Sequence, residues 1–202
     1  MRLAYLFCLC GLVLVGCTTV PTNYLSEYYA TMDDEEHVVA AVDPQDLDLE
    51  NLRQVVPYRS PYKPGTIIVD TAARFLYLVQ AGNTAIRYGI GVGREGMEFS
   101  GSAVINHKRK WPGWTPTPDM IRRDPERYGQ YADGVPGGAS NPLGARALYL
   151  FKDGRDTLFR IHGTTEPWSI GKASSSGCIR MINQDVIDLY ERVEPGATVV
   201  VI

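Results

Sequence analysis

The sequence predicts a mainly β fold with one helix in the C-terminal region and a long irregular flap. From Gly65 onward the chain consists of short runs rich in β-branched and aromatic residues, with turn residues between them. Apolar residues at helical spacing are convincing only near the C-terminal end, and residues 111–144 are too rich in proline and glycine for a central strand. These features together favour a domain built mainly from short strands.

The expected strands are short apolar runs, each bounded by residues that favour turns. A hairpin connection is expected over residues 152–156, where Gly154 can adopt a positive φ angle. We predict strands at residues 66–70, 74–79, 84–93, 102–107, 145–151, 157–162 and 197–202.

One helix is expected directly before the last strand. Apolar residues at helical spacing run from Val186 to Val193, and Asn183 can cap the N-terminus of this helix. Pro195 and the glycine after it end the helix.

The segment 111–144 is expected to form a flap outside the sheet. Prolines and glycines interrupt it repeatedly, and Trp111 and Trp114 supply large aromatic surfaces. A long insertion of this kind in a compact domain is often a lid or a substrate loop. Trp114 is therefore a candidate substrate-binding residue, and the alternative is a flap that only covers the core.

Residues 1–16 have the features of a lipoprotein signal peptide, because Arg2 precedes an apolar run too short to span a membrane. The run ends in Leu-Val-Gly-Cys17, which resembles a bacterial lipoprotein box with a lipid attached to the Cys17 thiol. Ordinary secretion with an unmodified Cys17 is the alternative. Thr18 follows, which resembles outer-membrane rather than inner-membrane lipoproteins. The expected location is the periplasm, with the protein lipid-anchored to the outer membrane of a Gram-negative bacterium.

Residues 17–63 are expected to be the lipidated N-terminus and a tether, and residues 64–202 the folded domain. The tether contains scattered prolines and an acidic run at 33–36, which we interpret as a solvated stretch with no specific partner. A weak apolar pattern at 38–42 can dock against the domain. The net charge is −3 and the basic residues do not exceed the acidic ones, so no nucleic-acid partner is expected.

Cys178 is expected to be the only free thiol of the mature chain. The sequence has 4 cysteines, of which Cys8 and Cys10 leave with the signal peptide and Cys17 is acylated. No intrachain disulfide can then form. A small buried core residue is the alternative for Cys178, but the serine-rich and glycine-containing stretch before it argues against a core strand.

A histidine lies one loop away from this thiol. His162 ends the predicted strand 157–162, and the loop 163–177 leads back to Cys178. A nearby imidazole is the usual means of generating a thiolate near neutral pH. The pair therefore indicates a cysteine acyl-transfer enzyme.

The neighbouring glycines have expected roles as well. Gly177 permits close approach of an acyl group, and backbone N–H groups around Gly177 and Cys178 can form an oxyanion hole. No Asp or Asn lies beside His162, so the Gly163 carbonyl is a candidate to orient its ring. Three histidines without clustered acids predict no metal site, and no cofactor is expected.

The segments Ile-His162-Gly-Thr and Ser-Ser176-Gly-Cys178-Ile-Arg-Met together resemble the catalytic motif of the YkuD-type L,D-transpeptidases. Pro-Gly-Thr-Ile-Ile-Val at 64–69, Tyr-Gly-Ile-Gly-Val-Gly at 88–93 and Asn-Pro-Leu-Gly at 141–144 also resemble this family. The resemblance covers about residues 64–202. It implies a β-sandwich-like catalytic domain whose active site lies in a cleft under a mobile flap.

The resemblance implies Cys178 as nucleophile and His162 as general acid and base. The thiolate would attack the diaminopimelate carbonyl of a peptidoglycan tetrapeptide stem and expel D-Ala. The acyl group would pass to an amine of another stem, of a D-amino acid or of a lysine in a wall-attached protein. Two alternatives stay open: an L,D-carboxypeptidase or protein-releasing hydrolase with the same pair, and a non-catalytic peptidoglycan-binding lipoprotein.

Two further positions follow from the resemblance. Arg180 resembles a family position near the site and can pair with a substrate carboxylate, or it can only support the loop. Ser176 stands where the family often has a second histidine, and it can donate a hydrogen bond from the same place.

Overall fold

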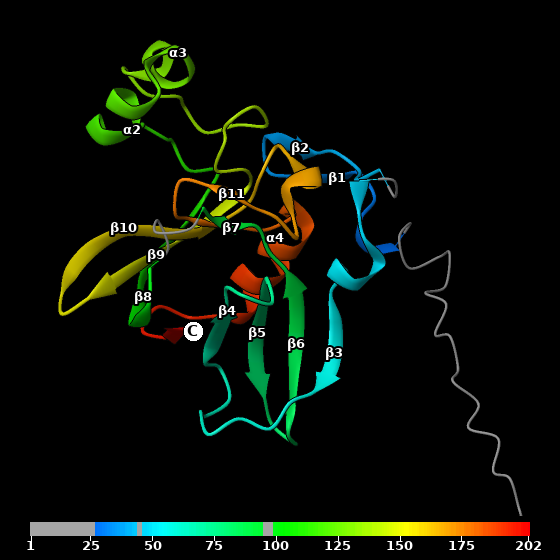
Figure 1. Ribbon diagram of the computed structural model, residues 1–202. Coiled ribbons are helices and arrows are strands. Elements are labelled where there is room, and N and C mark those ends of the chain that lie inside the picture. Colours follow the sequence, from blue (N-terminus) through cyan, green and yellow to red (C-terminus); the bar gives the residue numbers. More distant parts are fainter. Residues whose placement is uncertain (1–26, 44–45, 95–98) are drawn as a thin grey trace, which may run out of the picture.

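The computed structural model describes residues 27–43, 46–94 and 99–202 (Figure 1). The predicted signal peptide and Cys17 lie outside the described residues. The strands are β1 (Met32–Asp34), β2 (His37–Val39), β3 (Gln54–Pro57), β4 (Ile67–Asp70), β5 (Phe75–Gln80), β6 (Thr84–Gly89), β7 (Val92–Gly93), β8 (Gly101–Lys110), β9 (Arg146–Lys152), β10 (Arg155–His162), β11 (Ala173–Ser175), β12 (Ile179–Arg180) and β13 (Thr198–Val201). The helical elements are η2 (Leu49–Asn51), α2 (Pro118–Arg123), α3 (Pro125–Tyr128), η3 (Gly129–Tyr131), η4 (Pro167–Ser169) and α4 (Asn183–Arg192).

Nine strands form one mixed sheet in the order β12-β10-β9-β8-β13-β4-β5-β6-β3. Most neighbours are antiparallel, but β13 is parallel to β4 and β12 is parallel to β10. The last strand therefore joins two parts of the sheet that run in different directions in Figure 1. The predicted mainly β class is confirmed, and most predicted strands are present with ends shifted by a few residues. The predicted strand 84–93 is instead divided into β6 and β7, and β7 pairs with β11 in a separate two-stranded sheet.

The main core lies between the sheet and α4. Val186 and Leu189 of this helix and Val193 directly after it are almost fully buried and pack in one cluster with residues from both parts of the sheet. Their spacing is the helical period that the sequence shows. Among the described residues, no helix is long and apolar enough to cross a membrane.

The tether predicted over 17–63 is wrong for the part of that segment which the structure describes. Strand β3 pairs with β6 and forms one edge of the nine-stranded sheet. Tyr29, Leu47 and Leu52 are buried in a second apolar cluster with Ile170 and Ile182, which lie far along the chain. These apolar residues are widely spaced in the sequence, so no local periodicity signals them.

The acidic run at 33–36 also has specific partners, which corrects the prediction of a solvated stretch. The Asp34 carboxylate accepts two hydrogen bonds from Arg146, at 2.6 and 2.8 Å, and the Arg146 side chain is only 2% exposed. The Glu35 carboxylate pairs with Lys110 at 2.6 Å, and the Trp111 indole N–H donates to the Asp34 carbonyl at 3.2 Å. The hairpin of β1 and β2 is thus fixed at the point where the flap begins.

The flap is not wholly irregular, because it contains α2, α3 and η3, and Figure 1 shows α2 and α3 set apart from the sheet. Thr117 and Asp124 cap the two short helices by accepting hydrogen bonds from the backbone N–H groups of Met120 and Arg127. A proline follows each cap at the first helical position, where proline is well tolerated. Two prolines of a segment that is too rich in proline for a strand, Pro118 and Pro125, therefore begin helices.

The hairpin between β9 and β10 is tighter than predicted. Lys152 pairs with Arg155, so the turn consists of Asp153 and Gly154, with φ angles of 51° and 74°. Positive φ at both positions is typical of the shortest hairpin turns, whose twist matches that of the strands. The predicted connection over 152–156 was too long because the two strands extend further along the chain.

Candidate active site

A cleft of about 730 Å³ lies between the flap, strand β10 and the loop that precedes β12. His162, Cys178, Arg180, Ser176 and Trp114 all line it. The structure therefore brings together in one cleft five of the site residues predicted from the sequence. Gly163 and Gly177 are their immediate neighbours in the chain.

The parallel pairing of β10 with β12 determines how the nucleophile and the base are placed. Ile161 lies opposite Ile179 and His162 lies opposite Arg180, and the Met181 N–H donates to the His162 carbonyl at 2.8 Å. Neighbouring strands are about 4.8 Å apart, so this register brings Cys178 beside the end of β10.

His162 is held in one tautomer by its own backbone. Its Nδ1 lies 2.6 Å from the Gly163 carbonyl, which can only accept, so Nδ1 carries the proton and Nε2 is the basic nitrogen. The Gly163 carbonyl thus makes the contact with the ring that its predicted orienting role requires. Burial and the charge of Arg180 lower the pKa of His162 to about 4, and the bond to Gly163 offsets this only in part. The imidazole is therefore neutral at pH 7.

Cys178 is partly exposed, and its thiol donates a long hydrogen bond of 3.9 Å to the Leu158 carbonyl. Desolvation raises the pKa of the Cys178 thiol, and the Arg160 backbone N–H and the charges of Arg160 and Arg180 oppose this rise. The resting pair is therefore a neutral thiol and a neutral imidazole. Deprotonation of the thiol has to accompany its attack on a substrate.

A strained residue presents the carbonyl that contacts the thiol. Leu158 has a φ angle of 63°, and the pairing of β10 with β9 shifts register between Asp156 and Arg160. The Leu158 N–H donates to the Asp156 carboxylate at 2.8 Å instead of to a strand partner. Backbone strain of about 1–3 kcal/mol is common at functional sites. No local sequence signal marks this bulge.

The loop before the nucleophile is closed by Ser175, which the sequence analysis did not single out. The Ser175 hydroxyl donates to the Cys178 carbonyl at 2.6 Å and accepts from the Gly177 N–H at 3.1 Å. The Gly177 N–H is thus already engaged, which corrects its predicted role as an oxyanion donor. Gly177 adopts a φ angle of 124°, so its place in this turn depends on glycine.

Asn183 does not cap α4 as predicted, because Ile182 occupies the cap position. Instead, its side chain accepts a hydrogen bond from the Ala145 N–H at 3.0 Å and donates one to the Thr164 carbonyl at 2.9 Å. A Cβ on Gly163 would lie 2.1 Å from the Asn183 Oδ1. Glycine at 163 therefore allows the amide to connect the start of β9 with the segment that follows His162.

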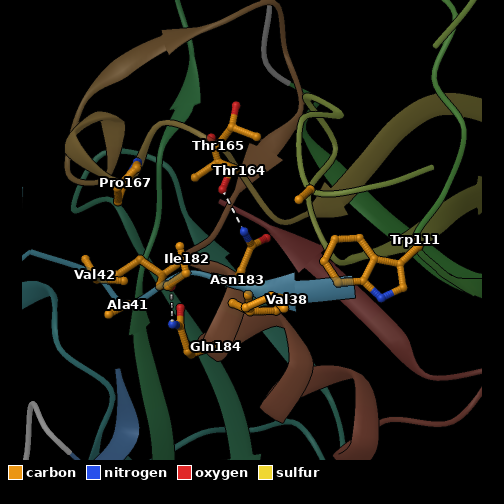
Figure 2. Close-up of a pocket in the computed structure, with 13 residues that line it drawn as sticks. Val38, Ala41, Val42, Trp111, Thr164, Thr165, Pro167, Ile182, Asn183 and Gln184 are labelled. Atoms are coloured by element: carbon orange, nitrogen blue, oxygen red, sulfur yellow. Dashed lines mark hydrogen bonds between the residues drawn. The ribbon is translucent and has the colours of Figure 1, made fainter. Parts of the chain in front are cut away.

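A second, smaller pocket of about 160 Å³ lies on the other side of Thr164 and Thr165. Figure 2 shows Val38, Ala41 and Val42 of the N-terminal segment around it, with Asn183 bonded to Thr164. Its lining is mainly apolar and contains no thiol, imidazole or carboxylate. The groups that can perform chemistry face the larger cleft.

The family model of the L,D-transpeptidase catalytic domain (YkuD) matches residues 64–202 of this chain. The chain belongs to the L,D-transpeptidase family. It is 34% identical to the Escherichia coli K12 protein "Probable L,D-transpeptidase ErfK/SrfK", in a match that covers 69% of this chain and 44% of that protein. For "Probable L,D-transpeptidase YbiS" of the same strain the identity is 30%, over 90% of this chain and 60% of that protein. The chain thus spans about half the length of these L,D-transpeptidases.

One solved structure is also similar to this L,D-transpeptidase domain. It is described as a "Probable carnitine operon oxidoreductase caia" from Brucella melitensis and is 55% identical. The match covers 73% of this chain and 91% of that chain, with a TM-score of 0.53. The family assignment itself rests on the family model and on the relatives named above.

Proposed function

We propose that this protein is a peptidoglycan L,D-transpeptidase that cross-links stem peptides through Cys178 and His162. The observation that carries the proposal is the cleft in which a thiol and an imidazole with a fixed tautomer face the same space. The family assignment supports a peptidoglycan stem peptide as the substrate class. Within that class, the stem that we propose is a tetrapeptide with diaminopimelate followed by D-Ala.

In the first half-reaction, the Cys178 sulfur attacks the diaminopimelate carbonyl while His162 Nε2 takes the thiol proton. The C–N bond to D-Ala then breaks, and His162 returns the proton to the leaving amine. The products are D-Ala and a thioester of the stem with Cys178. A neutral imidazole is the form that this step requires, and the low pKa of His162 provides it at neutral pH.

In the second half-reaction, an amine attacks the thioester carbonyl and gives its proton to His162. The C–S bond breaks, and the sulfur takes the proton back from the imidazolium. The acceptor that we propose is the diaminopimelate amine of a second stem. A lysine of a wall-attached protein would react by the same steps, and water in place of the amine would make the enzyme a carboxypeptidase or hydrolase.

The test is mass spectrometry of tetrapeptide muropeptides incubated with the detergent-solubilised protein, beside its Cys178→Ala variant. Stem dimers that form with loss of D-Ala, and only with the intact thiol, are expected. Tripeptides without dimers would favour the hydrolase. Binding of muropeptides without any thiol-dependent product would favour the peptidoglycan-binding lipoprotein.

The pH dependence of the reaction follows from the two pKa shifts. Protonation of His162 removes the base, so kcat/KM should fall only as the pH drops toward about 4, where burial places this pKa. The thiol pKa is raised, so the reactive pair stays unchanged through neutrality. We expect a plateau from about pH 5 to about pH 8 in kcat/KM for D-Ala release. An acid limb centred near the ordinary histidine pKa of about 6.5 would contradict the buried, neutral imidazole.

We also propose that Cys17 carries a lipid and holds the protein at the outer membrane, facing the periplasm. The lipoprotein-like box before Cys17 and the residue after it support this location. Metabolic labelling with a palmitate analogue should mark the protein and should be lost in a Cys17→Ser variant. Equal labelling of both forms would contradict lipidation at Cys17.

A further inference from the structure

Two adjacent residues of the flap helix α3 contact the floor of the cleft. The Tyr128 hydroxyl lies 3.3 Å from the Ser176 hydroxyl, at the position where the family often has a histidine. The Arg127 guanidinium lies 4.0 Å from the Glu166 carboxylate. Trp114 packs edge-on against Tyr128, with ring centroids 6.2 Å apart. Helix α3 of the flap therefore contacts the floor of the active-site cleft directly.

The Glu166 carboxylate contacts two arginines, and the two contacts differ in length. Its Oε2 accepts a hydrogen bond of 2.8 Å from Arg180, whose side chain is 16% exposed. Its other oxygen is only at ion-pair distance from Arg127, whose side chain is 46% exposed. One carboxylate thus faces two guanidinium groups, and the tighter bond belongs to the arginine of the floor.

The ionisable side chains on this wall of the cleft carry a net positive charge, because its arginines outnumber its carboxylates. Arg122 also lines the cleft, but it pairs with Asp119 on the same helix, so these two charges cancel. Among the described residues, the guanidinium of Arg127 contacts the Glu166 carboxylate in that weak ion pair and the Tyr128 ring, whose centroid is 5.5 Å away. A guanidinium presents a planar fork that binds a carboxylate with two parallel hydrogen bonds. The Arg127 fork makes no such pair of bonds within the part of the chain that the structure describes.

We propose that Arg127 recognises a carboxylate of the stem peptide, and that Glu166 is the internal carboxylate that keeps Arg127 over the cleft until substrate enters. This inference rests on the function proposed above. A substrate carboxylate would replace a 4.0 Å contact by a bidentate pair. Because Arg127 lies in the flap, the exchange couples substrate binding to closure of the flap.

The two carboxylates nearest the reacting bond are those of the terminal D-Ala and of the diaminopimelate side chain. Stems in which one or the other is converted to its amide distinguish the two sources. KM and kcat for release of D-Ala, or of its amide, are measured for three stems: the unmodified one and each of the two amides. The proteins are the parent, Arg127→Gln and Glu166→Gln, each in detergent.

A charged hydrogen-bonded pair contributes about 1.5–3 kcal/mol, so Arg127→Gln should raise KM for the unmodified stem by about 10- to 100-fold. Its kcat should change little. For the amide stem that lacks the recognised carboxylate, KM of Arg127→Gln should exceed that of the parent by less than about twofold. Glu166→Gln should shift KM in the opposite direction, because it removes the internal competitor for Arg127.

Arg155→Gln serves as the matched control, because Arg155 is exposed at the β9–β10 hairpin and does not line the cleft. It should leave KM unchanged for all three stems. If Arg127→Gln does not fold, Arg127→Lys keeps the charge but loses the fork, and it should show a smaller rise with the same selectivity.

An unchanged KM in Arg127→Gln, or an equal rise for all three stems, would overturn the inference while leaving the transpeptidase proposal intact. Absence of D-Ala release by the parent protein with every stem would instead contradict the proposed function, and this inference with it.

Discussion

Replacement of His162 by asparagine is expected to lower kcat/KM for D-Ala release by about 10³-fold while the protein stays folded. General acid–base catalysis contributes about 10²–10⁴-fold, and this variant has no Nε2 to accept the thiol proton. The asparagine Nδ2 can take the place of Nδ1 and keep the bond to the Gly163 carbonyl, which is 2.6 Å long in the parent. The loss should therefore appear in the rate and not in the melting temperature.

The matched control is His107→Asn, which makes the same change at a histidine outside the residues that line the cleft. His107 stacks on Tyr149, with ring centroids 4.1 Å apart, and has no part in the proposed chemistry. This variant should keep nearly the parent kcat/KM. A His162→Asn protein with parent-like kcat/KM would contradict the assignment of the base.

Replacement of Asp34 by alanine is expected to lower the free energy of unfolding by about 3–5 kcal/mol, because it leaves the buried Arg146 guanidinium without its carboxylate. The Arg146 side chain is 2% exposed, so water cannot take over the two lost hydrogen bonds without rearrangement. Urea unfolding followed by circular dichroism measures the loss.

Asp33→Ala is the control, since Asp33 precedes Asp34 on the same strand and is exposed. It should change the unfolding free energy by less than about 0.5 kcal/mol. The double variant Asp34→Ala/Arg146→Met should recover part of the loss, because no unpaired charge is then buried. Equal effects of the two aspartate variants would mean that the hairpin of β1 and β2 is not a stabilising part of the domain.

The sheet and the reacting pair were predictable because their signals are local. Most strands of the nine-stranded sheet carry an apolar run of their own. His162 and Cys178 are close in sequence, and the pairing of β10 with β12 brings them close in space. The orienting Gly163 carbonyl was predictable for the same reason, since it belongs to the next residue.

The N-terminal segment could not be predicted because its contacts are distant in sequence. Asp34 and Arg146 are 112 residues apart, and Tyr29 donates a hydrogen bond to Asp185, 156 residues away. An acidic run looks solvated when its partner is that far along the chain. In the flap, proline was interpreted as a breaker, whereas after Thr117 and Asp124 it begins a helix.

The supporting residues of the site were missed because their roles depend on three-dimensional geometry. No local sequence pattern marks the turn that Ser175 closes, the register shift near Leu158 or the ion pair of Glu166. Asn183 lies where a helix cap is expected, but its amide bonds across to Ala145 and Thr164. The prediction therefore singled out the right residue at position 183, but it assigned the wrong hydrogen-bond partners to its side chain.

The protonated resting state of Cys178 has a consequence for the survival of the enzyme. Peroxides and other oxidants attack the thiolate form of cysteine, and the first product is a sulfenic acid that can be oxidised further and irreversibly. Cys178 is the free cysteine of the described residues, so no neighbouring thiol there can rescue it as a disulfide. Because desolvation raises the pKa of the Cys178 thiol, little thiolate is present at neutral pH, and we expect oxidants to react slowly with Cys178 between turnovers.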